Sequence, residues 1–510
     1  MKITTCKQAV TYLEGFIRPS IFKSITPQEA EKMNPLLRME KLLEFLGNPH
    51  KKFKSVQVTG TSGKGSTSYL ISKILTQAGY KTGLTISPHI QKANERIQIN
   101  NIQIKDKDFI EIINKFPKIV VQMVSAGFEE PTYYELLLSI AFLYFAQEKI
   151  DIAVVEVGLE GKYDATNLVD APVVVLTNIG LDHTEILGDT VEKIANEAVF
   201  AIGKNAVVVT GEKNPKVLKI IEERCRETNS KLLKADKDFS FKINKENSEG
   251  ISFNFNLQGR TLLALNFNLQ GRTLLALKNI DLSLVGDYQA KNATLAISAV
   301  LNLEKIGFKV SEKDIKEALS SAFFPGRFEI INLGAEVASE NFRVHSAGKL
   351  GLKSKKSEGA NAHSENFEIS PRSLKLILDG AHNVDKMKAF LSSLNKYFPK
   401  EKKIFLVAFK KDKNIKEMIK QIQKYAEKII FSEFLAVTDM SKNPSFKITN
   451  YKPACRQAGF KSKIYYEKDS KKALGVSLKL AQNIPDSIIV VTGSLYFVGE
   501  IRSLLAGRGT

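Results

Sequence analysis

The sequence has little cysteine and no long apolar run, and both shortages exclude classes of protein. Its 510 residues include only three cysteines, Cys6, Cys225 and Cys455, which form no C-x-x-C pair and exclude a disulfide scaffold. Such usage is typical of reduced thiols in a cytoplasmic protein. The longest apolar run, residues 136–146, is too short to cross a bilayer, and the first ten residues lack an apolar stretch. We therefore expect a cytoplasmic protein with no secretory signal and no membrane partner.

Charge of one sign is in excess. The 74 lysines and arginines outnumber the 55 aspartates and glutamates, which gives a formal net charge of +19. That balance is compatible with nucleic acid or with small anionic substrates. No zinc-finger spacing, RNP motif or arginine-rich tract accompanies it, so we expect no nucleic-acid partner. Hydrophobic residues make up 43% and charged residues 25% of the chain, a mixture that excludes a wholly disordered protein.

Short β-branched runs alternate with segments of helical length in both halves of the chain. This alternation predicts two parallel α/β domains. We place the first domain at residues 1–322, closed by a helix over 288–303, and a smaller one at 323–510, with Pro325-Gly326 at the join. The strands that we expect lie at 56–58, 152–157, 173–177, 206–210, 374–378, 404–407, 428–431 and 488–492.

Two segments have the composition of insertions. Residues 254–265, NFNLQGRTLLAL, recur without change as residues 266–277. Each copy has the pattern of a strand, a glycine turn and a strand, so we expect an extra hairpin or an extruded loop rather than a function. Residues 341–373 are rich in Ser, Lys, Gly and Asn and cannot build a core, which predicts a disordered insertion.

A glycine-rich segment, GTSGKGST at residues 60–67, carries the strongest local signal for chemistry. It follows a short β run and precedes a helical pattern over 69–78, the arrangement in which backbone N–H groups converge on phosphate oxygens. Lys64 can reach the β- and γ-phosphates, and Ser66 or Thr67 can offer a hydroxyl to Mg²⁺. The strict G-x-x-x-x-G-K-[ST] pattern is not met, because Val58 and Gly65 stand where it requires other residues.

Two further groups stand out from the residues alone. Glu156 lies at the carboxyl end of a buried strand, and a carboxylate there is well placed to hold Mg²⁺ beside ATP phosphates. Without further information it could equally cap a neighbouring helix. Tyr133 and Tyr134 beside Glu135 offer a ring to stack against and a carboxylate to accept N–H bonds, or they could be buried tyrosines at a helix start.

The phosphate-loop variant resembles that of the Mur ligase superfamily, most closely the folylpolyglutamate synthase/dihydrofolate synthase family. Further motifs support the resemblance in order over nearly the whole chain: RM at 38–39, LGNP at 46–49, SPH at 87–89, ERI at 95–97, PTYYE at 131–135, EVGL at 156–159, DATN at 164–167, TNIGLDHT at 177–184, GDYQ at 286–289 with NA at 292–293, PGRFE at 325–329, DGAHN at 379–383 and VTGSLY at 491–496. The resemblance implies an α/β fold with an N-terminal P-loop ATP-binding domain of the Mur ligase type and a smaller C-terminal Rossmann-like domain.

The resemblance also implies roles for individual residues. The ATP-binding set is Gly60, Thr61, Gly63, Lys64, Gly65, Ser66, Thr67, Asn292, Arg327, Asp379 and His382. Ser66, Ser87, Glu156 and His183 would hold Mg²⁺, and Thr132, Tyr134 and Glu135 would bind the folate. Lys64, Glu156, His183 and Arg327 would form the catalytic group.

The implied reaction is an ATP-dependent amide ligation. A folate or dihydropteroate carboxylate would take the γ-phosphoryl group of ATP, and the amine of L-glutamate would attack the acyl phosphate. The resemblance leaves open whether the activity is that of folylpolyglutamate synthase, dihydrofolate synthase or both, and it implies a monomer. A peptidoglycan Mur-type ligase and a degenerate ATP-binding homologue with little turnover are the alternatives.

The sequence departs from the family pattern at two places. The family has a lysine, carbamylated and helping to hold a metal ion, where this chain has Ala198. Either the second metal ion is held differently, or activity is weak, or Lys204 substitutes. The family pattern Gly-x-Gly-Gly is Gly158-Leu159-Glu160-Gly161 here, which changes the backbone and the charge of that loop.

Overall fold

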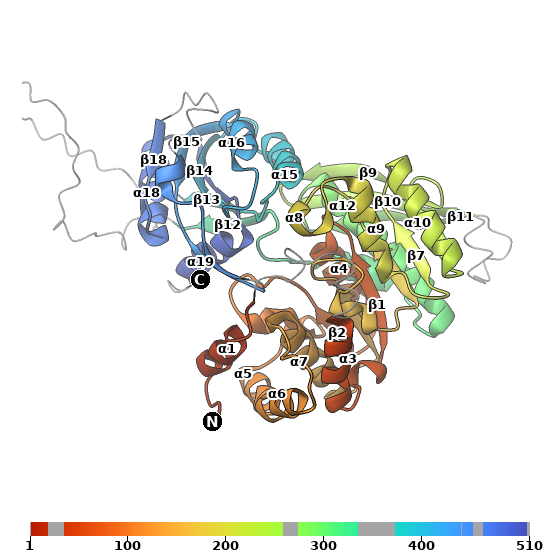
Figure 1. Cartoon of the computed structure of the whole chain (residues 1–510). Helices are drawn as coiled ribbons and strands as arrows, with labels where there is room; N and C mark the ends of the chain where they lie inside the picture. Colours follow the sequence, from red (N-terminus) through yellow and green to blue (C-terminus); the bar gives the residue numbers. More distant parts are fainter. Residues whose placement is uncertain are drawn as a thin grey trace, which may run out of the picture. The chain divides into compact units, whose positions relative to one another are not determined.

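The computed structural model describes residues 2–18, 35–258, 274–334, 373–439, 441–451 and 463–506 (Figure 1). Residues 259–273 of the duplication, 341–372 of the predicted insertion and Cys455 lie outside the described residues. The chain divides into two compact units. The first comprises Met1–Phe328, Lys388–Ser393 and Leu435–Asn443, and the second comprises Glu329–Met387, Leu394–Phe434 and Pro444–Thr510.

An eight-stranded sheet with the order β4-β3-β2-β5-β1-β6-β7-β8 forms the centre of the first unit. Neighbours are parallel from β2 to β8, and β3 and β4 are added antiparallel at one edge. The strands are β1 (Lys54–Thr59), β2 (Thr82–Thr85), β3 (Ile97–Ile99), β4 (Ile102–Gln103), β5 (Ile152–Glu156), β6 (Val173–Leu176), β7 (Val207–Thr210) and β8 (Lys231–Lys234). Runs of valine and isoleucine suit these central strands because both of their faces are buried.

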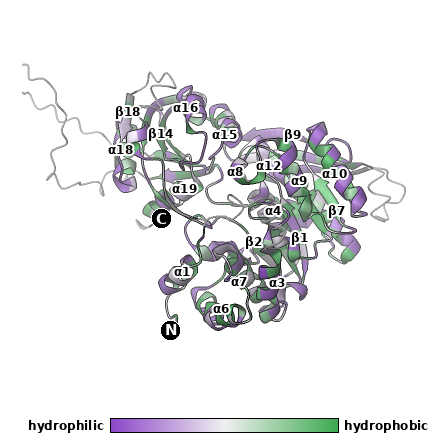
Figure 2. Ribbon diagram, viewed as in Figure 1, coloured by the Kyte–Doolittle hydropathy of each residue, from purple (hydrophilic) through white to green (hydrophobic). Residues whose placement is uncertain are grey.

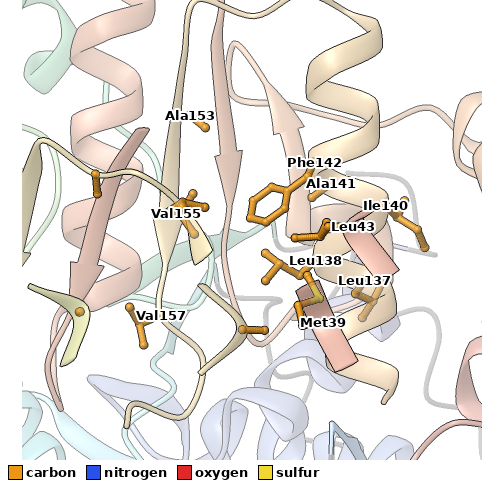
Figure 3. Close-up of a cluster of buried hydrophobic side chains, with 14 of the residues drawn as sticks. Met39, Leu43, Leu137, Leu138, Ile140, Ala141, Phe142, Ala153, Val155 and Val157 are labelled. Atoms are coloured by element: carbon orange, nitrogen blue, oxygen red, sulfur yellow. The ribbon is translucent and has the colours of Figure 1, made fainter. Parts of the chain in front are cut away.

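Alternation along the strands divides the apolar side chains of this unit between two cores. Ala153 and Val155 of β5 belong to one core, whereas Val154 belongs to the other. Figure 3 shows part of the first core, with Val155 near Leu138 and Phe142. The helices are α1 (Cys6–Glu14), α3 (Pro35–Phe45), α4 (Lys64–Gln77), α5 (Asp106–Ile113), α6 (Phe116–Ser125), α7 (Tyr133–Gln147), α8 (Thr184–Leu187), α9 (Val191–Ala198), α10 (Pro215–Glu227), α12 (Asp287–Asn302) and α13 (Glu312–Ser320). Helices α3 and α7 contribute to the first core, and α4, α12 and α13 to the second.

A separate three-stranded antiparallel sheet joins the second core of this unit. It consists of β9 (Phe239–Asn247), β10 (Gly250–Gln258) and β11 (Leu274–Leu282), with β10 in the middle. The start of the first repeat copy lies in β10 and the end of the second copy lies in β11, and these ends pair with each other from Phe255↔Leu277 to Gln258↔Leu274.

A six-stranded sheet with the order β12-β13-β19-β14-β15-β18 forms the second unit. Only β12 is antiparallel to its neighbour. The strands are β12 (Glu329–Leu333), β13 (Leu374–Leu378), β14 (Lys402–Val407), β15 (Ala426–Phe431), β18 (Lys463–Tyr466) and β19 (Ser487–Thr492). The helices are α15 (Val384–Tyr397), α16 (Ile415–Gln423), α18 (Ser470–Asn483) and α19 (Leu495–Ala506). A short ladder, β16 (Leu435–Thr438) with β17 (Ser441–Pro444), lies mostly within a segment that clusters with the first unit.

The predicted fold class is confirmed: each unit is an α/β fold on a mainly parallel sheet. All eight predicted strands are present to within two residues at either end, and the predicted helix at 288–303 is α12. Figure 2 shows hydrophobic colouring along β7 and hydrophilic colouring along much of α10, as burial inside and exposure outside require. The domain boundary at residue 323 stays a prediction. Within the described part of the chain, no helix has the length and apolar character needed to cross a membrane.

Candidate functional site

The phosphate loop connects β1 to α4 and lies at the carboxyl edge of the first unit's sheet. Gly60 has φ +117, and a Cβ there would lie 2.2 Å from Thr177 Oγ1, so only glycine fits. Gly63 is the N-cap of α4 with φ +85. The Thr61 N–H donates to the Asn178 carbonyl at 2.8 Å, which ties the loop to the end of β6. The first N–H groups of α4 therefore face the space beyond the sheet edge, as an anion site requires.

Lys64 is held by a carboxylate from the loop that follows β5. Its Nζ lies 3.0 Å from Glu160 Oε1, and the same oxygen accepts the Gly60 N–H at 3.0 Å. Burial by itself lowers the pKa of the Lys64 ammonium, but the carboxylates of Glu160 and Glu156 outweigh it and raise that pKa above its ordinary value. Lys64 is therefore a firmly protonated, largely buried cation.

Glu156 ends β5 next to this loop. Its Oε2 accepts the Ser87 N–H at 2.7 Å, and its Oε1 lies 3.5 Å from the position that a Cβ on Gly65 would occupy. Burial raises the pKa of the Glu156 carboxyl, and the positive charges of Lys64 and Arg327 act against that rise. The structure thus brings Glu156, Ser87, Gly65 and Lys64 together.

Asn292 and the segment that precedes α8 approach the same loop from two other elements. His183 is the N-cap of α8, and the charge of the preceding Asp182 contributes to the raised pKa of Lys64. Asn292 lies on α12, and its Oδ1 would be 2.3 Å from a Cβ on Gly63. Asn292 therefore lies directly against the phosphate loop.

Arg327 lies near the end of the first unit. Its guanidinium is 5.9 Å from the centre of the Phe324 ring, and its charge reaches the Glu156 carboxylate. The position is consistent with a group that neutralises anionic oxygens at this edge.

A small cavity adjoins Glu156 and contains one of the predicted folate residues. Its lining is Thr85, Ile86, Ser87, Arg96, Tyr134, Leu137, Leu138 and Glu156. The Tyr134 ring covers the backbone of Gly158, where a Cβ would lie 2.6 Å from its Cζ. Tyr134 therefore meets the metal-site candidates Ser87 and Glu156 in one cavity.

Thr132 and Glu135 have other partners. Thr132 is the N-cap of α7 and forms a capping box with Glu135. The Glu135 carboxylate also makes a two-pronged ion pair with Arg38, with both Nε–Oε2 and Nη2–Oε1 at 2.9 Å. These contacts fix the start of α7, which positions Tyr134.

Arg96 is a site residue that we did not predict, although its motif was part of the resemblance. It lines the cavity, its guanidinium lies 5.8 Å from the centre of the Tyr133 ring, and its Nε donates to His89 Nδ1 at 3.0 Å. Its Nη1 and Nη2 donate to the Asp439 carboxylate at 3.0 and 2.7 Å, so the charge of this buried arginine is already paired. The signal in the sequence was the ERI motif at 95–97, which we counted for the family and not for the site.

Asp379 and His382 belong to the second unit. Asp379 follows β13, and its Oδ1 accepts the Ala381 N–H at 2.9 Å. His382 Nδ1 lies 2.7 Å from the Gly380 carbonyl oxygen, and its Nε2 lies 3.1 Å from Lys386 Nζ. With Nδ1 protonated, Nε2 accepts from the lysine. Both residues thus lie in one loop at the carboxyl end of a parallel strand.

Two family models match the chain. The Mur ligase middle domain matches residues 58–300, and the C-terminal domain of dihydrofolate synthetase matches residues 363–505. The dihydrofolate synthase/folylpolyglutamate synthase of Bacillus subtilis is 29% identical over 92% of this chain and 94% of its own length.

Solved structures agree with these matches. A folylpolyglutamate synthase from Thermotoga maritima has a TM-score of 0.72 and 27% identity, covering 98% of this chain and 96% of that one. A complex of folylpolyglutamate synthase with AMPPCP and folate has a TM-score of 0.70 and 25% identity, covering 98% of this chain and 100% of that one. The chain belongs to the folylpolyglutamate synthase/dihydrofolate synthase family.

This member of the family differs from the expected pattern at Ala198 and Glu160. Ala198 is buried at the end of α9, whereas Lys204 is exposed in the loop that follows. Lys204 therefore does not occupy the buried position of Ala198. Glu160 is the partner of Lys64, a contact that the sequence did not predict.

Proposed function

We propose that this protein joins L-glutamate to a folate carboxylate at the expense of ATP. The observation that carries the proposal is the phosphate loop, with the Lys64 ammonium beside the buried Glu156 carboxylate at the carboxyl edge of a parallel sheet. Family membership supports this substrate class, and the acceptor would be a folate, dihydropteroate or both.

The reaction has two steps. A carboxylate oxygen of the acceptor attacks the γ-phosphorus, the bond to the β-phosphate oxygen breaks, and ADP leaves. The amine of glutamate then attacks the acyl carbon, gives up a proton, and expels inorganic phosphate as the amide bond forms. Both steps depend mainly on positioning and on neutralisation of phosphate charge.

We propose that Lys64 and Arg327 neutralise the charge of the phosphates, and that Asn292 contacts the adenine region of the nucleotide. The N–H groups of the phosphate loop would bind the phosphates, which assigns this role to Gly60, Thr61, Gly63, Gly65, Ser66 and Thr67. Asp379 and His382 stay proposed nucleotide ligands of the second unit. These assignments agree with the protonated state of Lys64 and with the reach of Arg327's charge to Glu156.

The residues at this edge fit Mg²⁺. Mg²⁺ keeps several waters and takes few protein oxygens besides substrate phosphates. Glu156 supplies a carboxylate, and the buried Thr67 Oγ1 has no hydrogen-bond partner among the described residues. We propose Ser66, Ser87, Glu156 and His183 as the residues that would hold the ion, which would add positive charge next to the phosphates.

The acceptor's ring would lie against Tyr134, at the start of α7. Thr132 and Glu135 would form the adjoining wall, with Glu135 held in place by Arg38. We also propose that the protein acts as a monomer.

The test is a product assay. The purified protein is incubated with MgATP and L-glutamate, separately with dihydropteroate and with tetrahydrofolate, and the products are measured by mass spectrometry. One or more added glutamyl units establish the ligase, and the accepted acceptor distinguishes the two activities. ATP binding without any product from either acceptor would contradict the proposal and favour the degenerate homologue, and binding of a UDP-sugar would favour the Mur-type ligase.

We expect Lys64→Ala to lower turnover by at least about 10²–10³-fold, because it removes the buried cation from the phosphate loop. Lys73→Ala, on the same helix and outside the loop, is the matched control and is expected to retain activity. Equal activity of the two variants would contradict the assignment of the phosphate loop.

A further inference from the structure

Glu160 adopts a backbone conformation that is unfavourable for a residue other than glycine. It has φ +72, in the left-handed region that glycine adopts most readily, and it lies in the loop directly after β5. Its side chain is only 3% exposed. A glutamate buried in this conformation needs strong contacts to hold it there.

Those contacts are the phosphate-binding groups themselves. Glu160 Oε1 accepts both the Gly60 backbone N–H and the Lys64 ammonium, each at 3.0 Å. An N–H of the glycine loop and the loop's lysine are the donors that such a loop offers to a phosphate oxygen. The other oxygen, Oε2, is buried and has no hydrogen-bond partner among the described residues. The carboxylate therefore uses the loop's donors while leaving half of its own acceptors unsatisfied.

We propose that the Glu160 carboxylate is an internal substitute for a nucleotide phosphate and competes with ATP for the phosphate loop. The inference rests on the proposed function, since it takes this loop as the site of ATP phosphates. A carboxylate and a phosphate cannot share the same two donors at hydrogen-bond distance, and their like charges repel in a buried site. Glu160 must therefore leave Gly60 and Lys64 before a phosphate binds there.

The consequence is that Glu160 lowers the apparent affinity of the protein for the nucleotide. If the chain is competent for phosphate only while Glu160 is displaced, the apparent Kd is the intrinsic Kd divided by the competent fraction. Removal of the negative charge raises that fraction. The unpartnered Oε2 favours displacement, because outside the loop this oxygen regains hydrogen bonds to water.

The experiment compares the wild type with Glu160→Gln and Glu160→Gly in the full chain. Glutamine keeps the size and an acceptor oxygen but loses the charge, and glycine suits the positive φ. Binding of ATP and of inorganic tripolyphosphate is measured by calorimetry, both with Mg²⁺ and with EDTA. We expect each variant to bind both ligands about tenfold or more tightly than the wild type under both conditions.

Glu222→Gln is the matched control. Glu222 forms a lysine pair in the same unit, 2.7 Å from Lys234 Nζ, without contact to the phosphate loop. It should leave both affinities unchanged. Circular dichroism melting of all variants confirms that they are folded.

Several outcomes would overturn the inference. Unchanged affinity in folded Glu160 variants contradicts competition, and weaker binding only with Mg²⁺ shows a metal-binding role instead. Weaker binding under both conditions shows that Glu160 only supports the loop. If no form of the protein, wild type included, binds ATP or tripolyphosphate, the proposed function itself fails.

Discussion

Lys64 and Glu156 show how burial and charge oppose each other at single residues. Burial favours the neutral form of each group, yet each lies within reach of the other's opposite charge. For Lys64 the neighbouring carboxylates prevail and its pKa is raised, whereas for Glu156 burial prevails and its pKa is raised as well. The site therefore keeps a protonated lysine next to a carboxyl group whose charged form is disfavoured by burial.

His50 is expected to make stability depend on pH. Burial, aided by the charge of Lys51, lowers the pKa of His50 to about 4. The unfolded chain, with a pKa of about 6.5, binds a proton at a higher pH than the folded chain does. The contribution of the neutral, buried His50 to the free energy of unfolding is thus fully present above about pH 6.5. It is lost as the pH falls toward 4, which lowers the free energy of unfolding by up to roughly 2–3 kcal/mol.

The variant His50→Gln removes this titration. We expect its free energy of unfolding in urea to fall less between pH 7 and pH 4 than that of the wild type. Circular dichroism is the suitable probe, because the chain contains no tryptophan. Parallel pH profiles of the two proteins would contradict the prediction, because they would mean that folding does not change the pKa of His50.

At the scale of elements, the first copy of the repeat supplies the end of β10 and the second copy supplies the start of β11. The first five residues of one copy, 254–258, lie in β10, and the last four of the other copy, 274–277, lie in β11. Phe255 and Leu257 face the core, opposite Leu277 and Leu275. One copy by itself contains both strand ends, with Gly-Arg-Thr between them.

Deleting residues 259–270 should therefore leave the sheet intact. Gln258 would be joined to Leu274 through Gly271-Arg272-Thr273, a three-residue link of ordinary hairpin length, and the present register would persist. We expect the free energy of unfolding to change by less than about 0.5 kcal/mol and ligase activity to be retained.

The control deletes residues 255–265, which leaves one extra residue in the first strand. That shift turns the following Phe and Leu away from the core, and we expect a loss of at least about 2 kcal/mol. Urea unfolding of the two deletion variants distinguishes them. Equal stability would mean that the β10–β11 register does not depend on the repeat's period.

At the scale of the whole molecule, residues far apart in the sequence complete the first unit. Arg96 Nη2 lies 2.7 Å from Asp439 Oδ1, across a sequence separation of 343 residues. Asp439 follows β16 in the segment Leu435–Asn443, which clusters with the first unit. The Arg96 side chain is 3% exposed, so this carboxylate contributes to its neutralisation in a buried place.

Asp439→Ala is expected to destabilise the protein by roughly 2 kcal/mol, because it removes a charged hydrogen-bond partner from a buried guanidinium. Asp189→Ala is the control. Asp189 pairs with Lys193 four residues along the same exposed stretch, and such pairs contribute little. Thermal unfolding by circular dichroism should separate the two variants, and equal melting temperatures would contradict the expectation.

The sequence by itself determined the elements and the kind of loop. Valine-rich runs such as 173–176 form β6, because a strand buried on both faces requires apolar residues throughout. The phosphate loop was predictable because its glycines, lysine and hydroxyls are contiguous and their conformation is local. The motifs that indicated the family are likewise short contiguous stretches, and they follow one another in order along the chain.

The tertiary structure alone decided which side chains meet. Glu160 pairs with Lys64 across 96 residues, Arg38 with Glu135 across 97, and Asn292 lies against Gly63. The Glu160–Lys64 contact follows from the strand order, which places the loops after β5 and β1 side by side at one edge. The other two contacts depend on the packing of α3 against α7 and of α12 against the phosphate loop. Strand order depends on long-range packing and not on local pattern. The sequence therefore showed a glutamate in place of a glycine, but only the fold showed that this glutamate pairs with the lysine of the phosphate loop.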